Sequence, residues 1–170
     1  MDWKQYTIER RKTAIYPRKV ALFYVLLMLV GEIGEVSAIA ERADYNQAAV
    51  LGELGDVCWY IAALQYELGV ESLDDLTPPK GWSDEVMLLG LFEGAAELQQ
   101  IVAKSYRDAD GVIDLPRKER MASVLGYLLS VVATLVVRAG GTLEGVLAAN
   151  IAKLADRHAR GVIGGSGDNR

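Results

Sequence analysis

The stretch that decides the fold reads Asn46-Gln47-Ala48-Ala49-Val50-Leu51-Gly52-Glu53-Leu54-Gly55-Asp56-Val57-Cys58-Trp59-Tyr60-Ile61-Ala62-Ala63-Leu64-Gln65-Tyr66-Glu67-Leu68. Its apolar residues recur every three or four positions without strand-like alternation, so it predicts one long helix. Gly69 follows, a residue type that often ends helices. The helix carries two acids, Glu53 and Asp56, at a spacing that places them on one face.

The same helical pattern continues on both sides of this stretch. The expected elements are helices over residues 3–13, 18–42, 46–68, 83–106, 117–138 and 142–160, a helical turn over 72–76 and a polar loop over 107–116. Thr77-Pro78-Pro79-Lys80-Gly81 is the clearest linker in the chain. The sequence therefore predicts an all-α fold, a helical bundle.

Composition narrows the classes of function. The chain has 170 residues, 51% of them hydrophobic, and a formal net charge of −5, which is typical of one globular domain or two small repeats that share a core. The acidic balance argues against nucleic-acid binding. The single cysteine, Cys58, excludes an internal disulfide, and the single histidine, His158, excludes a ferritin-like di-iron site, which needs two histidines. Charge appears at Asp2, too early for a signal peptide, so we expect a cytoplasmic protein.

One segment challenges the soluble interpretation. Met121–Val137 contains no charged residue and has the length of a minimal membrane span. Polar residues such as Ser123, Ser130 and Thr134 interrupt it, and no other segment is comparable. We therefore expect a buried central helix and no membrane partner.

The two sides of the Pro78-Pro79 linker resemble each other. Val50-Leu51-Gly52 matches Val124-Leu125-Gly126, and Ser72-Leu73-Asp74 matches Thr142-Leu143-Glu144 in the same order. These matches favour an internal duplication over coincidence. We interpret residues 1–80 and 81–170 as two tandem helical hairpins packed around one shared core as an internal pseudo-dimer.

Four acids point to a metal site. Glu32 and Glu35 are spaced on one helix as Glu53 and Asp56 are on the next, and all four stand among apolar residues. Like charges near an apolar surface are costly unless a cation neutralises them. Carboxylates without histidine favour Mg²⁺, or Mn²⁺, and phosphate chemistry. The alternative is a solvated acidic face without a ligand.

These acids carry a family resemblance. Glu32-Ile33-Gly34-Glu35 followed by Glu53-Leu54-Gly55-Asp56 resembles the motif of the MazG family of all-α nucleoside triphosphate pyrophosphohydrolases, a superfamily that includes dimeric dUTPases and phosphoribosyl-ATP pyrophosphatases. Lys12-Thr13-Ala14-Ile15-Tyr16-Pro17 is similar to its lead-in, and Asn150-Ile151-Ala152-Lys153-Leu154-Ala155-Asp156-Arg157 to its closing motif. The likeness covers most of the chain.

The resemblance implies an enzyme that converts a (d)NTP to the monophosphate and pyrophosphate with Mg²⁺, in nucleotide-pool house-cleaning. It implies that the four acids hold the metal and that Asn150, Lys153 and Arg157 hold the phosphates. One carboxylate must accept the proton of the attacking water, and we assign this role to Glu32. The competing interpretation is a catalytically degenerate nucleotide-binding or helical interaction protein of the same fold.

The second half departs from the motif. Gly94, Tyr127 and Ser130 stand where the first half has Glu32, Glu53 and Asp56, whereas the closing motif lies only in the second half. We therefore expect one active site per chain, built across both halves, in a monomeric pseudo-dimer or a homodimer.

Aromatic residues are candidates for substrate contact. Tyr60 follows Asp56 by one helical turn, and Tyr16 lies in the lead-in together with Trp3 and Tyr6 near the chain start. Aromatic faces stack on bases. The alternative for each is packing in the core, which we expect for Cys58 and Trp59.

Overall fold

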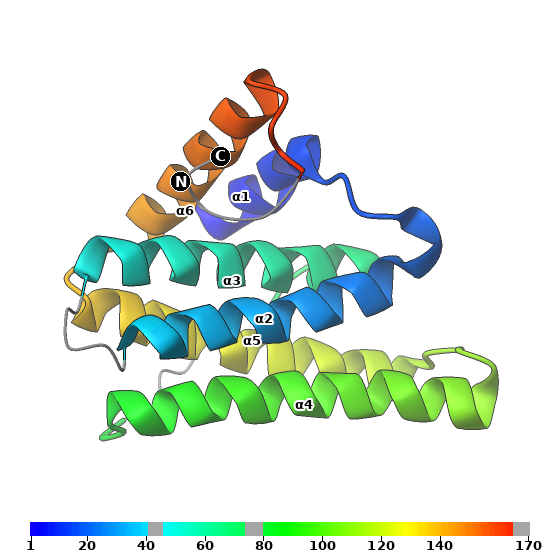
Figure 1. The fold of residues 1–170 in the computed structure, drawn as a ribbon. Coiled ribbons are helices and arrows are strands. Elements are labelled where there is room, and N and C mark those ends of the chain that lie inside the picture. The colour runs from blue at the N-terminus through cyan, green and yellow to red at the C-terminus, as the bar shows by residue number, and fades with distance from the viewer. Residues whose placement is uncertain (41–45, 74–79, 165–170) are drawn as a thin grey trace.

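The computed structural model describes residues 1–40, 46–73 and 80–164, and within these ranges every regular element is helical (Figure 1). The elements are α1 (Trp3–Glu9), η1 (Arg10–Thr13), η2 (Arg18–Val20), α2 (Ala21–Ala40), α3 (Gln47–Leu68), α4 (Asp84–Ala109), α5 (Leu115–Arg138) and α6 (Leu143–Ala159), where η marks a 3-10 helix. The prediction of an all-α helical bundle is confirmed.

Polar caps start the helices that the sequence predicted. The side chains of Asn46, Ser83, Asp114 and Thr142 each accept a hydrogen bond from a backbone N–H in the first turn of α3, α4, α5 and α6. Gly69 ends α3 in the left-handed conformation, with φ of 67°. Local sequence signals therefore set most helix boundaries.

The predicted loop over 107–116 was too long at both ends. Helix α4 continues to Ala109, and Asp110 and Gly111 then turn the chain with positive φ angles. Helix α5 begins at Leu115 with a proline in its first turn, where the missing N–H has no intrahelical partner to lose. The predicted turn over 72–76, the linker over 77–81 and the end of the helix over 18–42 lie largely outside the described residues.

The helices form two stacked pairs with a third layer on top. Helices α2 and α3 pack against each other and against α4 and α5, while α1 and α6 lie side by side across α3 (Figure 1). The core runs between the pairs, and α5 contributes many of its fully buried side chains. Cys58 is fully buried and Trp59 is 8% exposed, so the prediction that both pack in the core is confirmed.

Three helical segments in the described part of the chain are long and apolar enough to cross a membrane, judged by length and composition alone. They are Arg18–Ala40, Asp84–Ala109 and Leu115–Arg138. The expectation of one such segment was wrong. It counted only uncharged runs, whereas the mean hydropathy of a helix can stay high when the helix contains an acid such as Glu32. In the folded chain 61% of the most apolar stretch of Leu115–Arg138 is buried, compared with 28% of the most apolar stretch of Arg18–Ala40.

Candidate metal centre

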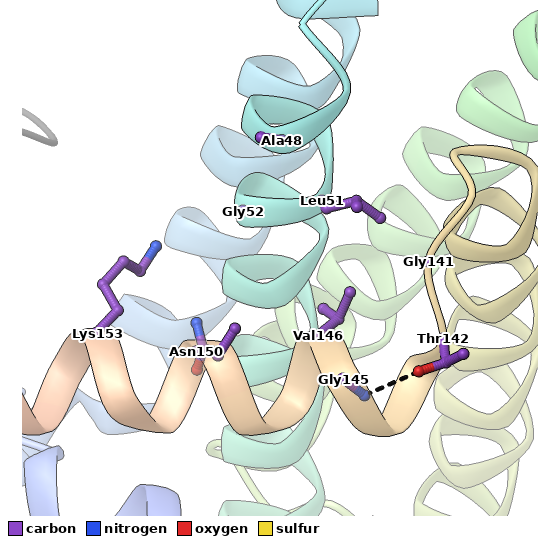
Figure 2. Close-up of a pocket in the computed structure, with 10 residues that line it drawn as sticks. Ala48, Leu51, Gly52, Gly141, Thr142, Gly145, Val146, Asn150 and Lys153 are labelled. Carbon is purple, nitrogen blue, oxygen red and sulfur yellow. Dashed lines mark hydrogen bonds between the residues drawn. The ribbon is translucent and has the colours of Figure 1, made fainter.

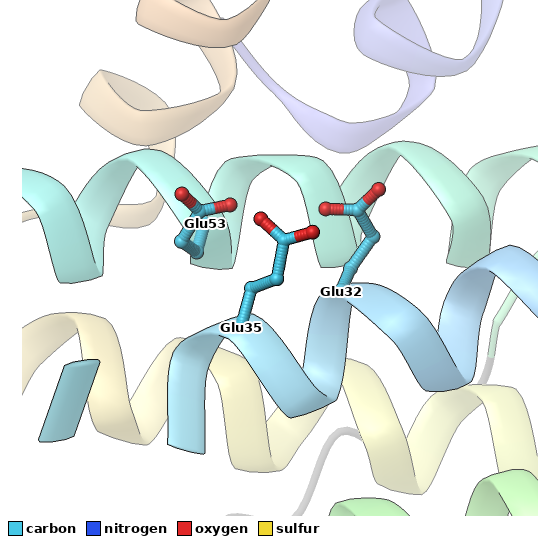
Figure 3. A group of neighbouring side chains, drawn as sticks. All are labelled: Glu32, Glu35 and Glu53. Atoms are coloured by element: carbon cyan, nitrogen blue, oxygen red, sulfur yellow. The ribbon is translucent and has the colours of Figure 1, made fainter. Parts of the chain in front are cut away.

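Three predicted metal ligands meet on the seam between α2 and α3. Glu32 and Glu35 lie one turn apart on α2, and Glu53 faces them from α3 (Figure 3). One carboxylate oxygen from each lies within 4.8 Å of those of the other two. Glu53 is buried, Glu32 is partly buried and Glu35 is exposed, so the cluster opens to solvent on one side. This arrangement of hard oxygen donors fits Mg²⁺ or Mn²⁺.

The same seam destabilises negative charge. The pKa of Glu32 is raised to about 8, mainly by burial and then by the negative charges of Asp56, Glu35 and Glu53. The ammonium group of Lys153 opposes this rise. Without a cation, Glu32 therefore retains its proton near neutral pH, and a bound divalent cation would favour the ionised form.

Asp56, the fourth predicted ligand, is engaged by another helix. One of its carboxylate oxygens accepts a hydrogen bond of 2.7 Å from Asn150 Nδ2, and the other accepts one of 2.5 Å from Lys153 Nζ. Both donors lie on α6, and the ion pair is largely shielded from solvent. Asp56 still acts on Glu32 through its charge. The structure thus joins Asp56 to two of the three predicted phosphate-binding residues.

Close packing of α6 on α3 holds this contact. Gly55 lies opposite Asn150, and a Cβ atom at Gly55 would lie 3.2 Å from the Asn150 Cβ, so the glycine allows the helices to approach. Tyr6 donates a hydrogen bond of 2.8 Å to Asn150 Oδ1 and thereby orients the amide toward Asp56. Arg157 is also buried, one turn beyond Lys153 on α6.

The aromatic candidates separate into two groups. Tyr6 is fully buried, so its ring offers no free face to a base, and Trp3 is partly buried with its indole N–H donating a hydrogen bond to Gln65. Tyr16 is 6% exposed and donates a hydrogen bond to Glu67, whereas Tyr60 is only half-buried. The pKa of Tyr60 is raised by burial and then by the negative charge of Glu32, which places it beside the carboxylates.

A cavity of about 500 Å³ adjoins the Asp56 contact (Figure 2). It lies between the N-terminal parts of α3 and α6 and is lined by Ala48, Leu51, Gly52, Gly141, Thr142, Gly145, Val146, Ala149, Asn150 and Lys153. The lining is mostly apolar, and two of its three polar side chains, Asn150 and Lys153, bind Asp56. The sequence analysis did not predict this cavity. Small residues on both helices, such as Gly52 on α3 and Gly145 on α6, could have indicated it.

Comparison with known proteins finds a similar phage protein. The chain is similar to the Gene 37 protein of Mycobacterium phage L5, with 40% identity over 82 residues, which cover 48% of this chain and 72% of that protein. No family model and no solved structure matches the chain.

Proposed function

Because this chain belongs to the family of the Gene 37 protein of Mycobacterium phage L5, a name that states no activity, we propose its function from the carboxylate site. The proposed function is a Mg²⁺-dependent, MazG-like nucleoside triphosphate pyrophosphohydrolase that converts a (d)NTP to the monophosphate and pyrophosphate. The observation that carries the proposal is the meeting of Glu32, Glu35 and Glu53 within 4.8 Å on a partly buried seam.

The donor set suits this chemistry. Glu32, Glu35 and Glu53 would hold Mg²⁺, with Mn²⁺ as a substitute, and Asp56 stands one turn from Glu53 on α3. The bound ion would neutralise phosphate oxygens and lower the pKa of a coordinated water. Water adds to a phosphorus of the α–β anhydride, the bridging P–O bond breaks and pyrophosphate leaves. Glu32 is our candidate to accept the proton of that water, because its environment raises its affinity for a proton.

The cations on α6 supply the complementary charge. Lys153 is partly exposed beside Asp56 and would turn to the substrate phosphates, with Asn150 as a neutral donor and Arg157 one turn further along. The adjoining cavity of about 500 Å³ has the size of small-molecule sites in proteins. Tyr60, half-buried beside Glu32, is our candidate for contact with the nucleoside.

The decisive experiment measures pyrophosphate release from a panel of ribonucleoside and deoxyribonucleoside triphosphates, with Mg²⁺ and with EDTA. We expect release from at least one nucleotide, dependent on Mg²⁺. Glu53→Gln should lower kcat by about a hundredfold or more, because it removes a ligand charge while retaining the side-chain volume. Circular dichroism should show an unchanged helical content.

The second candidate function is a nucleotide-binding protein without catalysis. It is favoured by the engagement of Asp56 with Lys153 and Asn150, since a carboxylate already paired with a cation is a weaker metal ligand. Nucleotide binding by calorimetry without turnover of any panel member would establish this alternative. Absence of both binding and turnover would contradict both functions.

A further inference from the structure

Arg10 is the most unusual side chain outside the carboxylate site. It is fully buried in η1, yet its Nε, Nη1 and Nη2 atoms have no hydrogen-bond acceptor among the described residues. Guanidinium groups keep their charge in proteins and carry five N–H donors. A buried cation normally has an anionic partner or several acceptors. Arg10 is therefore suited to bind a negatively charged group with several hydrogen-bond acceptors.

The surroundings of Arg10 are aromatic. The guanidinium carbon lies 5.2 Å from the centroid of the Trp59 ring and 5.5 Å from that of the Tyr66 ring. The indole Nε1 of Trp59 is likewise buried and has no acceptor within the part of the chain that is described. Two neighbouring side chains thus present donors that no described acceptor satisfies in hydrogen-bond geometry, which fits a bound oxyanion rather than a neutral ligand.

Further cations lie around this position, and the nearby acids have partners. Arg11 lies 4.3 Å from the Tyr66 ring centroid, and Arg18 lies 5.3 Å from that of Tyr16. Glu67 accepts hydrogen bonds from Tyr16 and Arg18. Burial and the hydrogen bond to Glu67 raise the pKa of Tyr16, and the side chain and charge of Arg10 oppose the rise. The Tyr16 hydroxyl therefore lies beside the guanidinium, although no Arg10 nitrogen reaches hydrogen-bond geometry. We call Arg10, Trp59 and Tyr66 the arginine box.

The arginine box adjoins the Asp56 contact along two paths. On α3, Trp59 follows Asp56 by three residues, a rise of about 4.5 Å along the helix. Across the bundle, Tyr6 hydrogen-bonds to Asn150, which binds Asp56, and α6 packs against η1. Tyr66 is 41% exposed, so it is the residue of the arginine box that reaches the surface.

We propose that the arginine box binds the terminal phosphates of the nucleoside triphosphate, the part that leaves as pyrophosphate, with Arg10 and the Trp59 indole as donors. This inference rests on the proposed function. The fork of donors on a guanidinium matches two oxygens of one phosphate group. Arg10 is thus a substrate-binding residue that responds to the number of phosphates, while the nucleoside lies elsewhere.

The test measures binding of sodium pyrophosphate by isothermal titration calorimetry in EDTA, so that neither metal binding nor turnover affects the result. Arg10→Met should weaken pyrophosphate binding by at least about tenfold. The matched control is Arg11→Met, which removes an exposed cation that contacts the ring and hydroxyl of the same Tyr66 and makes the same change in net charge. The control should change affinity by less than about threefold. Binding of a nucleoside monophosphate, which lacks the terminal phosphates, should be the same in both variants.

Equal affinity losses in the two variants, or an Arg10→Met protein that binds pyrophosphate like the unmodified chain, would overturn the proposal. If Arg10→Met does not fold, Arg10→Lys retains the charge without the fork and Trp59→Phe retains a ring without the donor. Both are expected to weaken pyrophosphate binding more than Arg11→Met does, and the opposite order rejects the box. Because binding is read without Mg²⁺, a failed triphosphate turnover assay and a failed arginine box give different results.

Discussion

The α2–α3 pair and the α4–α5 pair occupy adjacent layers, but their seams differ in chemistry (Figure 1). In the first pair, Glu32, Glu35 and Glu53 gather on the seam. In the second pair, Gly94 lies against Leu128, and Ser130 donates a hydrogen bond to a carbonyl of its own helix. Glu97, which the predicted duplication aligns with Glu35, forms an exposed ion pair with Arg120.

This comparison shows how one helical pattern serves two purposes. The first seam contains concentrated negative charge that raises the pKa of Glu32, and such strain is typical of functional sites. The second seam packs without voids at Gly94 and satisfies its polar groups locally. One pair is suited to bind a cation, and the other is suited to support it.

The largest expected effect distinguishes Glu35 from Glu97, the two acids that the predicted duplication aligns. Glu35→Gln should lower Mg²⁺-dependent pyrophosphate release by about a hundredfold, because it removes one charge from the cluster. Glu97→Gln should alter kcat/KM by less than about twofold, because the ion pair of Glu97 with Arg120 is exposed and contributes little free energy. Similar losses in both variants would remove the functional difference between the two seams.

A smaller effect concerns pH and the metal-free protein. The folded-state pKa of Glu32, about 8, lies above its ordinary value of 4.5, so the folded chain binds more protons than the unfolded chain between these values. Stability should therefore fall as pH rises from about 4.5 to 8 and then level off. In EDTA we expect a Tm about 5 °C lower at pH 8 than at pH 5.5 from this group.

Glu32→Gln is the control for that pH dependence, since it retains the volume without titrating. Its Tm should change less with pH than that of the unmodified chain, and Mg²⁺ should stabilise the unmodified chain more at pH 8 than at pH 5.5. An identical pH dependence in both proteins, measured by scanning calorimetry, would contradict the raised proton affinity of Glu32.

The smallest effect compares glycines in the two pairs. A Cβ atom at Gly94 would lie 2.7 Å from Leu128 Cδ2, whereas one at Gly31 would meet nothing within 4 Å. Gly94→Ala should destabilise the chain by about 1 kcal/mol, as overpacking outweighs the gain in helix propensity. Gly31→Ala should stabilise it by about 0.5–1 kcal/mol. Urea denaturation measures both, and a stabilised Gly94→Ala variant would show that the second seam is loosely packed.

Much of the fold was predictable because the helices depend on local signals. Periodic apolar residues predicted each long helix, and Asn46, Ser83 and Thr142 marked their starts. The spacing of Glu32 and Glu35 was enough to place them on one face of α2, since that relation lies within a single helix. The boundaries near Ala109 and Leu115 were wrong, where turn chemistry competes with helix propensity. The helices predicted from residues 3 and 18 are α-helical only in part, with 3-10 turns over Arg10–Thr13 and Arg18–Val20.

The sequence by itself determined which residues share a helix and which acids share a face. The tertiary structure alone decided that Asp56 binds Asn150 and Lys153 of α6 and that the buried Tyr6 binds the same Asn150. It also decided that Arg10 lies beside the rings of Trp59 and Tyr66. These contacts join residues far apart in the chain, such as Asp56 and Lys153. They depend on how α6 crosses α3 and on the rotation of each helix about its axis, which the spacing within one helix does not specify.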